Sequence, residues 1–284
     1  MCFGVRDAIA LALKENEAAP LTVLGDLVHN ETVLAGLRAE GIEIKQAAAE
    51  IETGRVMITA HGASQLRMNE VRRRGLNVLE ATCPLVKVAH DALAELVQSD
   101  FHPVIIGRRD HVEVRGMTED LAEFDMVLTE ADVNQVRERA RFGVMAQTTQ
   151  PIDKAQRLTA LLRQRFPKAE FRFIDTVCRP TKQRQTAAAE LARNSDAVVV
   201  IGGANSNNTR ELVATCQRHC ARVHHVQDAN GLRADWFADA RTVGITAGTS
   251  TPDSVIAAVE AWLRTFAAEK NQFRKTIAAE LRAG

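Results

Sequence analysis

Hydrophobic and polar positions along this chain follow two periods in turn, and this alternation predicts a fold of strands and helices. Short apolar runs are typical of buried strands, and they lie at residues 21–24, 55–59, 103–106, 125–128, 144–146, 173–177 and 197–201. Longer amphipathic segments predict helices, and they lie at residues 5–14, 31–40, 85–97, 131–138, 152–165 and 181–193. Strands that alternate with helices form parallel sheets with crossover connections, so we expect an α/β fold.

Three cysteines share one position in this pattern, directly before a predicted helix. The next polar turn follows each of them after 27 or 28 residues: His29 after Cys2, His111 after Cys83 and Ser206 after Cys178. A second polar turn follows at residues 60–64, 147–149 and 246–250. Matched offsets indicate a repeated unit. We therefore predict three quasi-equivalent αβα lobes with mainly parallel sheets, at residues 1–83, 84–177 and 178–267. A C-terminal helical tail follows at 268–284, and the functional edges of the lobes face a common centre.

Polar side chains gather in these turns, where open α/β sheets place their ligand-binding groups. The turns hold His29, His61, His111, Glu113, Thr148, Ser206, Asn207, Asn208 and Ser250. One histidine near a strand end, or one serine before a helix, has an ordinary structural explanation such as capping. Recurrence in successive turns favours a ligand site instead. Small and amide residues before a helix present N–H groups to an anion such as phosphate, although no Gly-Lys-Ser or Gly-Lys-Thr makes a Walker loop here.

Glu113 is the candidate proton donor. It lies two residues after His111, so an extended segment would turn both side chains toward one cavity. The alternative is a solvated glutamate at the start of a helix, where its charge complements the helix dipole.

Composition narrows the classes of partner. Lys plus Arg and Asp plus Glu each total 36, so no overall basic field would hold nucleic acid or an anionic membrane. No apolar run approaches the roughly 18–20 residues that span a bilayer, and residues 1–19 lack the continuous apolar core of a secretory signal. Five cysteines are too few for a disulfide scaffold, and we expect them to be reduced in a cytoplasmic protein. Cys216 and Cys220 have no counterparts at matched offsets and are interpreted as small buried hydrophobes.

The cysteines before helices suit two kinds of metal site: a zinc ion with an additional ligand, or an iron–sulfur cubane with one open iron. Cys83 lies 81 residues after Cys2, and Cys178 lies 95 after Cys83, which excludes a local zinc knuckle. An open iron beside a phosphate site and a carboxylate indicates reductive removal of a hydroxyl from a phosphorylated substrate. Two other classes stay open: a non-catalytic iron–sulfur redox or sensor protein, and a zinc-stabilised phospholigand-binding protein.

The motifs also carry a resemblance over almost the whole chain. They lie, in order, at residues 2–5, 28–30, 60–65, 81–86, 111–113, 147–149, 176–185, 205–208 and 246–250. In content and order they resemble the LytB-type 4-hydroxy-3-methylbut-2-enyl diphosphate reductase family. The resemblance implies three α/β lobes around a central, oxygen-sensitive 4Fe–4S cluster held by Cys2, Cys83 and Cys178.

The resemblance also implies the substrate and its ligands. The substrate hydroxyl would bind the unique iron, and a small diphosphate would be held by His29, His61, His111, Ser206, Asn207, Asn208 and Ser250. Glu113, assisted by Thr148, would supply protons as two electrons break the C–O bond. The products would be isopentenyl and dimethylallyl diphosphate, and a ferredoxin or flavodoxin would donate the electrons.

The chain departs from the family pattern at two places. The family normally has a strand and an Arg-Gly-Phe-like approach before its first cysteine, whereas Cys2 follows Met1 directly. Either the start is assigned too late or this edge has been lost, and we expect about ten added upstream residues to raise cluster occupancy, since chain termini fray. The usual His-Pro-Glu-Val-Glu run is His-Val-Glu-Val-Arg at residues 111–115.

Overall fold

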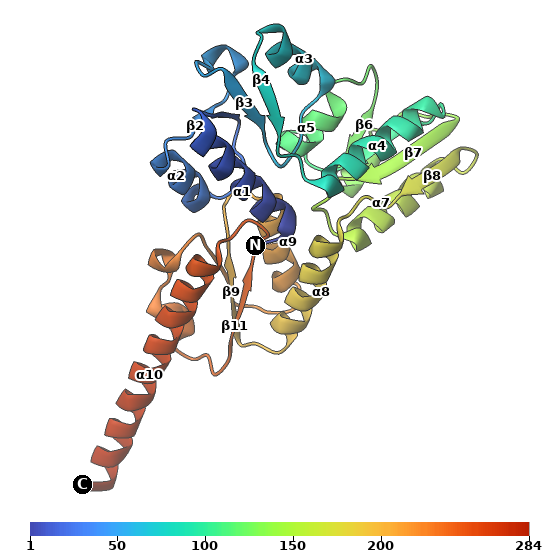
Figure 1. The fold of residues 1–284 in the computed structure, drawn as a ribbon. Coiled ribbons are helices and arrows are strands. Elements are labelled where there is room, and N and C mark those ends of the chain that lie inside the picture. Colours follow the sequence, from blue (N-terminus) through green and yellow to red (C-terminus); the bar gives the residue numbers. More distant parts are fainter. Residues whose placement is uncertain (284) are drawn as a thin grey trace. The chain divides into compact units, whose positions relative to one another are not determined.

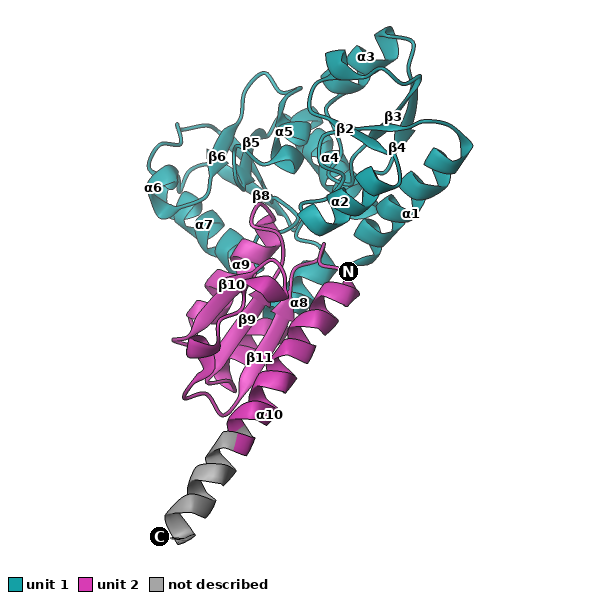
Figure 2. Ribbon diagram, turned by 90° about the vertical axis from the view of Figure 1, so that its left-hand side faces the viewer, with its two compact units in different colours: residues 1–186 teal, residues 187–284 magenta. Residues whose placement is uncertain are grey.

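The computed structural model describes residues 1–283, without the side chains of 271 and 273–283, and the chain forms two compact units. Unit 1 is Met1–Thr186 and unit 2 is Ala187–Gly284 (Figure 2). The boundary between them falls within helix α8 (Arg179–Arg193). Each unit is built from parallel strands with helices on both faces of the sheet (Figure 1).

The first sheet of unit 1 has the strand order β2-β1-β3-β4, and its pairings are parallel. Its elements are α1 (Phe3–Ala18), β1 (Thr22–Leu24), α2 (Glu31–Ala39), β2 (Glu43–Lys45), β3 (Arg55–Ile58), α3 (Gln65–Arg73) and β4 (Asn77–Glu80). α1 and α2 cover one face, where Val23 and Met57 enter their core. α3 covers the other face with Leu24 and Val56, because successive side chains of a strand point to opposite sides.

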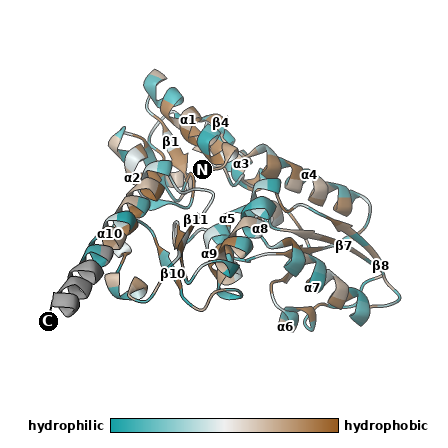
Figure 3. Ribbon diagram, turned by 90° about the horizontal axis from the view of Figure 1, so that it is seen from below, coloured by the Kyte–Doolittle hydropathy of each residue, from teal (hydrophilic) through white to brown (hydrophobic). Residues whose placement is uncertain are grey.

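The second sheet of unit 1 has the order β6-β5-β7-β8 and is also parallel. Its elements are α4 (Pro84–Gln98), β5 (His102–Ile106), α5 (Val112–Thr118), β6 (Asp125–Val127), α6 (Glu130–Val133), β7 (Arg141–Ala146), α7 (Ile152–Arg165) and β8 (Glu170–Ile174). α6 and α7 pack on one face, and α4 and α5 pack on the other. Figure 3 shows hydrophobic colours along β7 and mixed colours on α4 and α7, as expected for a covered strand and amphipathic helices.

Unit 2 holds a parallel sheet of order β10-β9-β11. Its elements are β9 (Ala197–Ile201), α9 (Asn207–Gln217), β10 (Val223–Val226), β11 (Val243–Ala247) and α10 (Asp253–Ala283), with 3-10 turns at Ala229–Gly231 and Ala234–Phe237. Val199 and Ile201 face the core under α10, while Val198 and Val200 face α8 and α9. β9 is therefore buried on both faces, which explains its continuous apolar sequence.

The three sheets of residues 1–283 confirm the predicted α/β fold of parallel, helix-covered lobes. β8 begins earlier than the predicted run at 173–177, and α6 is shorter than the predicted 131–138. The lobe boundaries after residues 83, 177 and 267 stay predictions. The predicted tail at 268–284 falls on α10 and on residues whose side chains are not described. Among the described residues, no helix is both long and apolar enough to cross a bilayer.

Candidate active site

Three cysteines of unit 1 each stand directly ahead of a helix, as the sequence pattern predicts. Cys2 is the N-cap of α1, Cys83 is the N-cap of α4, and Cys178 precedes α8. All three thiols are free and partly buried. A Cβ placed on Gly4 would lie 2.5 Å from the Cys83 sulfur. Because glycine has no side chain, the first turn of α1 can lie directly against Cys83.

Burial and hydrogen bonding act in opposite directions on two of these sulfurs. Burial raises the pKa of the Cys83 thiol, and two backbone N–H groups in the first turn of α4 oppose the rise by bonding the sulfur. Burial also raises the pKa of the Cys178 thiol, whose sulfur lies 3.1 Å from the Thr181 hydroxyl. The charge of Cys2 contributes to both shifts, so the three sulfurs lie within electrostatic range of one another.

Within the described part of the chain, no three His, Cys, Asp or Glu side chains converge as ligands of one metal ion. A cubane cluster places each thiolate on a different iron, so its ligands need not converge on one point. Three soft sulfur donors at helix N-termini fit such a cluster, and N–H or hydroxyl groups are directed at the sulfurs of Cys83 and Cys178.

Three imidazoles of unit 1 form a compact group, which we call the histidine cluster. The ring centroids of His29 and His61 lie 4.3 Å apart in a stacked arrangement. His111 lies edge-on, 4.9 Å from His29 and 5.7 Å from His61. His29 lies before α2, His61 follows β3, and His111 is the N-cap of α5, so both sheets of the unit contribute.

Two of these imidazoles are held neutral. Burial lowers the pKa of His111 to about 3, with further lowering from His29 and Arg108. Burial also holds the pKa of His61 well below its usual value, again with help from the neighbouring rings. The Glu113 backbone N–H donates to His111 Nδ1 at 3.2 Å, so the neutral ring carries its proton on Nε2. The cluster therefore offers uncharged N–H donors.

Glu113 is a buried carboxylic acid on the same helix, with 2% of its surface exposed. Burial raises its pKa to about 7, although the Thr148 backbone N–H donates to its Oε1 at 2.7 Å and opposes the shift. A carboxyl group with this pKa is partly protonated at neutral pH. It has the acidity expected of a general acid.

The sequence left two structures open for this segment: an extended run facing a cavity, or a helix start with a solvated glutamate. The structure shows a helix start with a buried glutamate. Residues 111–115 are not extended, because α5 begins at Val112 and places Glu113 in its first turn. The His111 side chain caps this helix by accepting the Glu113 N–H. The capping bond stabilises a helical start that side-chain alternation alone could not reveal.

Two backbone hydrogen bonds join the cysteines to these polar groups. The Cys178 N–H donates at 3.0 Å to the carbonyl of Thr148, the same residue whose N–H holds the buried acid. The Cys83 N–H donates to the Ala60 carbonyl at 3.0 Å, one residue before His61. Sulfurs, imidazoles and the acid therefore belong to one connected region of unit 1.

In unit 2, the remaining predicted residues follow the carboxyl ends of two neighbouring strands. β9 leads to Ser206, Asn207 and Asn208, and β11 leads to Ser250. Ser206 caps α9 by accepting a backbone N–H of its first turn at 3.3 Å. The Thr249 N–H donates to Asn208 Oδ1 at 3.0 Å and so joins the two turns.

The amide nitrogen of Asn208 is a buried donor, and the described residues supply no hydrogen-bond partner for it. Its oxygen is already held by Thr249, which fixes the orientation of the amide. A buried donor left unpaired is costly unless a ligand accepts its hydrogen bond. This amide group therefore suits an anion.

Three further polar residues belong to these groups and were not predicted. Thr59 accepts the His61 N–H at 3.3 Å, and Gln147 is fully buried with its amide nitrogen unpaired among the described residues. The Thr209 hydroxyl is also buried and has no hydrogen-bond partner within residues 1–283, and a Cβ on either Gly202 or Gly248 would collide with it. The sequence signal that could have found them is their position in the chain, since each is next to a residue in one of the turn motifs.

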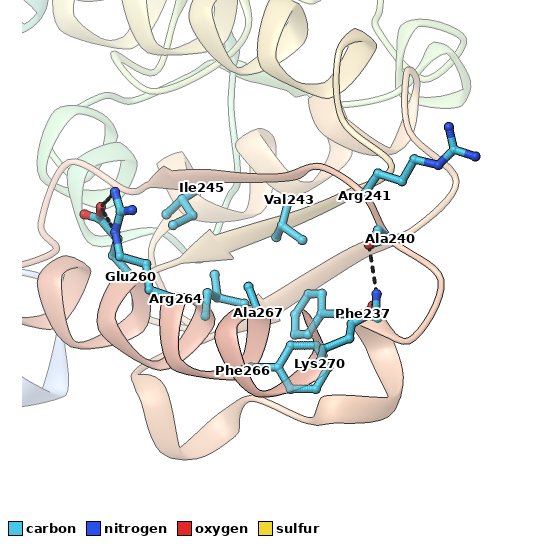
Figure 4. Close-up of a pocket in the computed structure, with 11 residues that line it drawn as sticks. Phe237, Ala240, Arg241, Val243, Ile245, Glu260, Arg264, Phe266, Ala267 and Lys270 are labelled. Atoms are coloured by element: carbon cyan, nitrogen blue, oxygen red, sulfur yellow. Dashed lines mark hydrogen bonds and ion pairs between the residues drawn. The ribbon is translucent and has the colours of Figure 1, made fainter. Parts of the chain in front are cut away.

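A cavity of about 510 Å³ in unit 2 lies apart from all of these residues (Figure 4). Its walls come from α10, β11 and the preceding turn: Phe237, Ala240, Arg241, Val243, Ile245, Glu260, Leu263, Arg264, Phe266, Ala267 and Lys270. Lys270 donates to the Phe237 and Ala240 carbonyls, and Glu260 pairs with Arg264. These charged groups already have partners within the protein.

Parallel helix-covered sheets, three cysteines ahead of helices and a buried acid beside neutral imidazoles define an α/β protein with a candidate active site for acid–base chemistry. Residues 1–264 match the family model described as LytB protein, and the chain belongs to this family. The resemblance seen in the sequence motifs is therefore confirmed.

Similar proteins carry one enzymatic name. A 4-hydroxy-3-methylbut-2-enyl diphosphate reductase of Anaeromyxobacter sp. (strain K) is 34% identical over 267 residues, covering 93% of this chain and 95% of the relative. The enzyme of the same name from Trichlorobacter lovleyi is 35% identical over 258 residues, with 90% and 91% covered. The solved structure of the E-1-hydroxy-2-methyl-but-2-enyl-4-diphosphate reductase from Plasmodium falciparum superposes with a TM-score of 0.84 at 25% identity, covering 90% of this chain and 83% of that one.

Proposed function

We propose that this chain reduces 4-hydroxy-3-methylbut-2-enyl diphosphate to isopentenyl and dimethylallyl diphosphate with a 4Fe–4S cluster. Membership of the LytB family and the shared name of its relatives support the assignment. The observation that carries it is the buried Glu113, whose pKa is raised to about 7. This acid lies in one region of unit 1 with Cys83, Cys178 and the histidine cluster.

Cys2, Cys83 and Cys178 would hold the cluster. Their sulfurs are free, partly buried and placed at helix starts, where N–H groups stabilise thiolates. When bound, such a cluster would supply electrons and a Lewis-acidic iron. We propose a ferredoxin or flavodoxin as electron donor. We also propose a cytoplasmic location, because free thiols need a reducing compartment until they ligate iron.

The diphosphate would be bound by uncharged donors. In unit 1 these are the N–H groups of His29, His61 and His111. In unit 2 they are the hydroxyl and amide groups of Ser206, Asn207, Asn208 and Ser250. Donors already fixed by the fold stabilise an anion without reorganising. The lowered pKa values of His61 and His111 keep this part of the site neutral, so the substrate's own charges are not held by fixed cations.

Glu113 would deliver protons. Net reduction consumes two electrons and two protons: the hydroxyl leaves as water when its C–O bond breaks, and the second proton ends on carbon. The Thr148 N–H donates to Glu113 Oε1, and the Thr148 side chain also hydrogen-bonds the carboxyl group. Thr148 thereby orients the acid, and its carbonyl also accepts the Cys178 N–H.

Anaerobic purification, followed by iron and sulfide assays and reduction assays with dithionite and a viologen mediator, tests the proposal. We expect iron and sulfide in equal amounts, about four of each per chain for a cubane, and turnover of the diphosphate substrate. Cys2→Ser, Cys83→Ser and Cys178→Ser should each deplete iron, while Cys216→Ser and Cys220→Ser should not, because the latter two thiols are buried in the core of unit 2. Zinc without sulfide would contradict the cluster, and a cluster without turnover would favour a non-catalytic redox protein.

A further inference from the structure

The end of α5 is bonded to the start of α3, although the two helices belong to different sheets of unit 1. The Asp120 carboxylate accepts the backbone N–H groups of Gln65 at 2.7 Å and Leu66 at 3.0 Å, one with each oxygen. The Ser64 hydroxyl donates to the carboxylate of Glu119 at 2.5 Å. We call these contacts the α3–α5 clamp.

The clamp serves a helix start that would otherwise be poorly satisfied. The first N–H groups of any helix lack partners within the helix. At the start of α3, the Ser64 hydroxyl accepts the N–H of Arg67 at 3.2 Å, and the Ser64 carbonyl accepts the N–H of Met68 at 3.0 Å. The preceding two N–H groups are bonded by Asp120, which lies 54 and 55 residues further along the chain. The carboxylate also complements the positive end of the helix dipole.

Each helix of the clamp adjoins the histidine cluster at or near its N-terminal end. α5 begins with His111 and Glu113 and ends just before the two acids. His61 lies on the six-residue loop between β3 and α3, residues 59–64, so fixing the start of α3 fixes the far end of that loop. Figure 1 shows α5 lying between the two sheets of unit 1.

The same helix also contacts the His61 loop at Gly116. A Cβ on Gly116 of α5 would lie 3.4 Å from the Ala63 Cα and 3.5 Å from the Gly62 carbonyl carbon. The bare glycine therefore lets α5 lie against the loop backbone. Gly116 thus contacts the loop at residues 62 and 63, and the clamp holds the chain just after it, at residues 64–66.

We propose that Asp120 is a positioning residue, which acts through the start of α3 to hold His61 against His111 for diphosphate binding. The inference rests on the proposed function and extends it to a residue outside the binding groups. Loss of the carboxylate frees two N–H groups of α3 and lets the His61 loop move relative to α5. Diphosphate affinity then falls, whereas the Thr148 contact that orients Glu113 is untouched.

Asp132 offers a matched control in the same unit. Its carboxylate also accepts two backbone N–H groups, those of Leu128 at 2.9 Å and Thr129 at 2.8 Å. These bonds stay within the turn between β6 and α6. Asp132→Ala therefore removes a comparable cap and its stabilisation without touching the His61 loop.

The test compares the cluster-loaded wild type with Asp120→Ala, Asp120→Asn and Asp132→Ala by calorimetric titration with inorganic pyrophosphate and by steady-state kinetics. For Asp120→Ala we expect affinity to fall and KM to rise by about 3- to 10-fold, with kcat within about 2-fold. Asp120→Asn keeps one acceptor oxygen, so its affinity for pyrophosphate should lie between those of the wild type and Asp120→Ala. Asp132→Ala should bind pyrophosphate with wild-type affinity. The unfolding temperature should fall by a similar amount in Asp120→Ala and Asp132→Ala.

An Asp120→Ala protein that binds pyrophosphate as tightly as Asp132→Ala would overturn the inference alone, leaving the reductase assignment intact. A fall in kcat with KM unchanged would also overturn it, because the clamp would then act on chemistry rather than on binding. A wild type that neither binds pyrophosphate nor reduces the substrate would overturn both the inference and the proposed function.

Discussion

Burial decides the chemistry of Glu113 at the scale of the single residue. Its pKa lies near 7 because the carboxylate loses water, and the N–H of Thr148 only partly compensates. Burial moves the pKa values of His61 and His111 in the opposite direction for the same reason, since burial penalises whichever form is charged. Exclusion from water therefore favours the protonated, neutral form of the acid and the unprotonated, neutral form of the imidazoles.

Glu113→Gln should lower turnover by about 10² to 10⁴, the range typical of general-acid loss. Glutamine keeps the size and the acceptor oxygen for the Thr148 N–H, so KM should change much less. The measurement is steady-state reduction beside a pyrophosphate titration of the same variant. Near-normal turnover would remove Glu113 from the mechanism.

The pH profile provides an independent check on the same residue. An acid with a pKa raised to about 7 is protonated below that value and loses its proton as the pH rises through it. Wild-type kcat should therefore decline above pH about 7, and the decline should be absent from the residual activity of Glu113→Gln. A profile that is identical in the two proteins would point to another group as the acid.

At the scale of the element, the contact between α1 and Cys83 depends on one missing side chain. Gly4→Ala would place a Cβ 2.5 Å from the Cys83 sulfur, so α1 or Cys83 must move. We expect iron per chain to fall well below the wild-type value in a parallel anaerobic preparation.

Gly36→Ala is the matched control, because Gly36 lies on α2 with nothing within 4 Å of its added Cβ. That substitution should leave iron content unchanged and stabilise the helix by roughly 0.5–1 kcal/mol. Full iron content in Gly4→Ala would show that the approach of α1 to Cys83 is not needed for the cluster.

The strands that could be predicted from the sequence are those with a continuous apolar run. β9 is buried along its whole length and was predicted at its observed bounds. β2 and β4 were missed because they are short and partly exposed, so their residues carry no comparable run. The apolar pattern of a sequence reflects which side chains are buried. Edge strands are held mainly by backbone hydrogen bonds, which place little demand on the side chains, so their sequences carry a weaker signal.

At the scale of the whole molecule, the proposal assigns diphosphate ligands to both units. Pyrophosphate at about 100 times its dissociation constant should stabilise the folded chain by about 2.7 kcal/mol and raise its melting temperature. His61→Ala in unit 1 and Ser250→Ala in unit 2 should each reduce that rise. If both variants show the wild-type shift, the turns are structural caps rather than ligands.

The candidate site was predictable as a set of residues but not as a set of contacts. Motif spacing and the family resemblance singled out the cysteines, the histidines and Glu113. The bond between Glu113 and Thr148 joins residues 35 apart, and the bonds of Asp120 to α3 join residues 54 and 55 apart. Such pairings depend on how two sheets pack, which local sequence does not encode.

The wide spacing of the three proposed ligands also constrains how the protein is made. Cys178 is added 176 residues after Cys2. At about 5–20 residues per second this delay is about 9–35 s. During that interval the first thiol is already synthesised while its partners are still missing. Delivery of iron and sulfide must therefore wait until nearly all of unit 1 has left the ribosome, and the nascent chain depends on cellular reductants to keep Cys2 available until then.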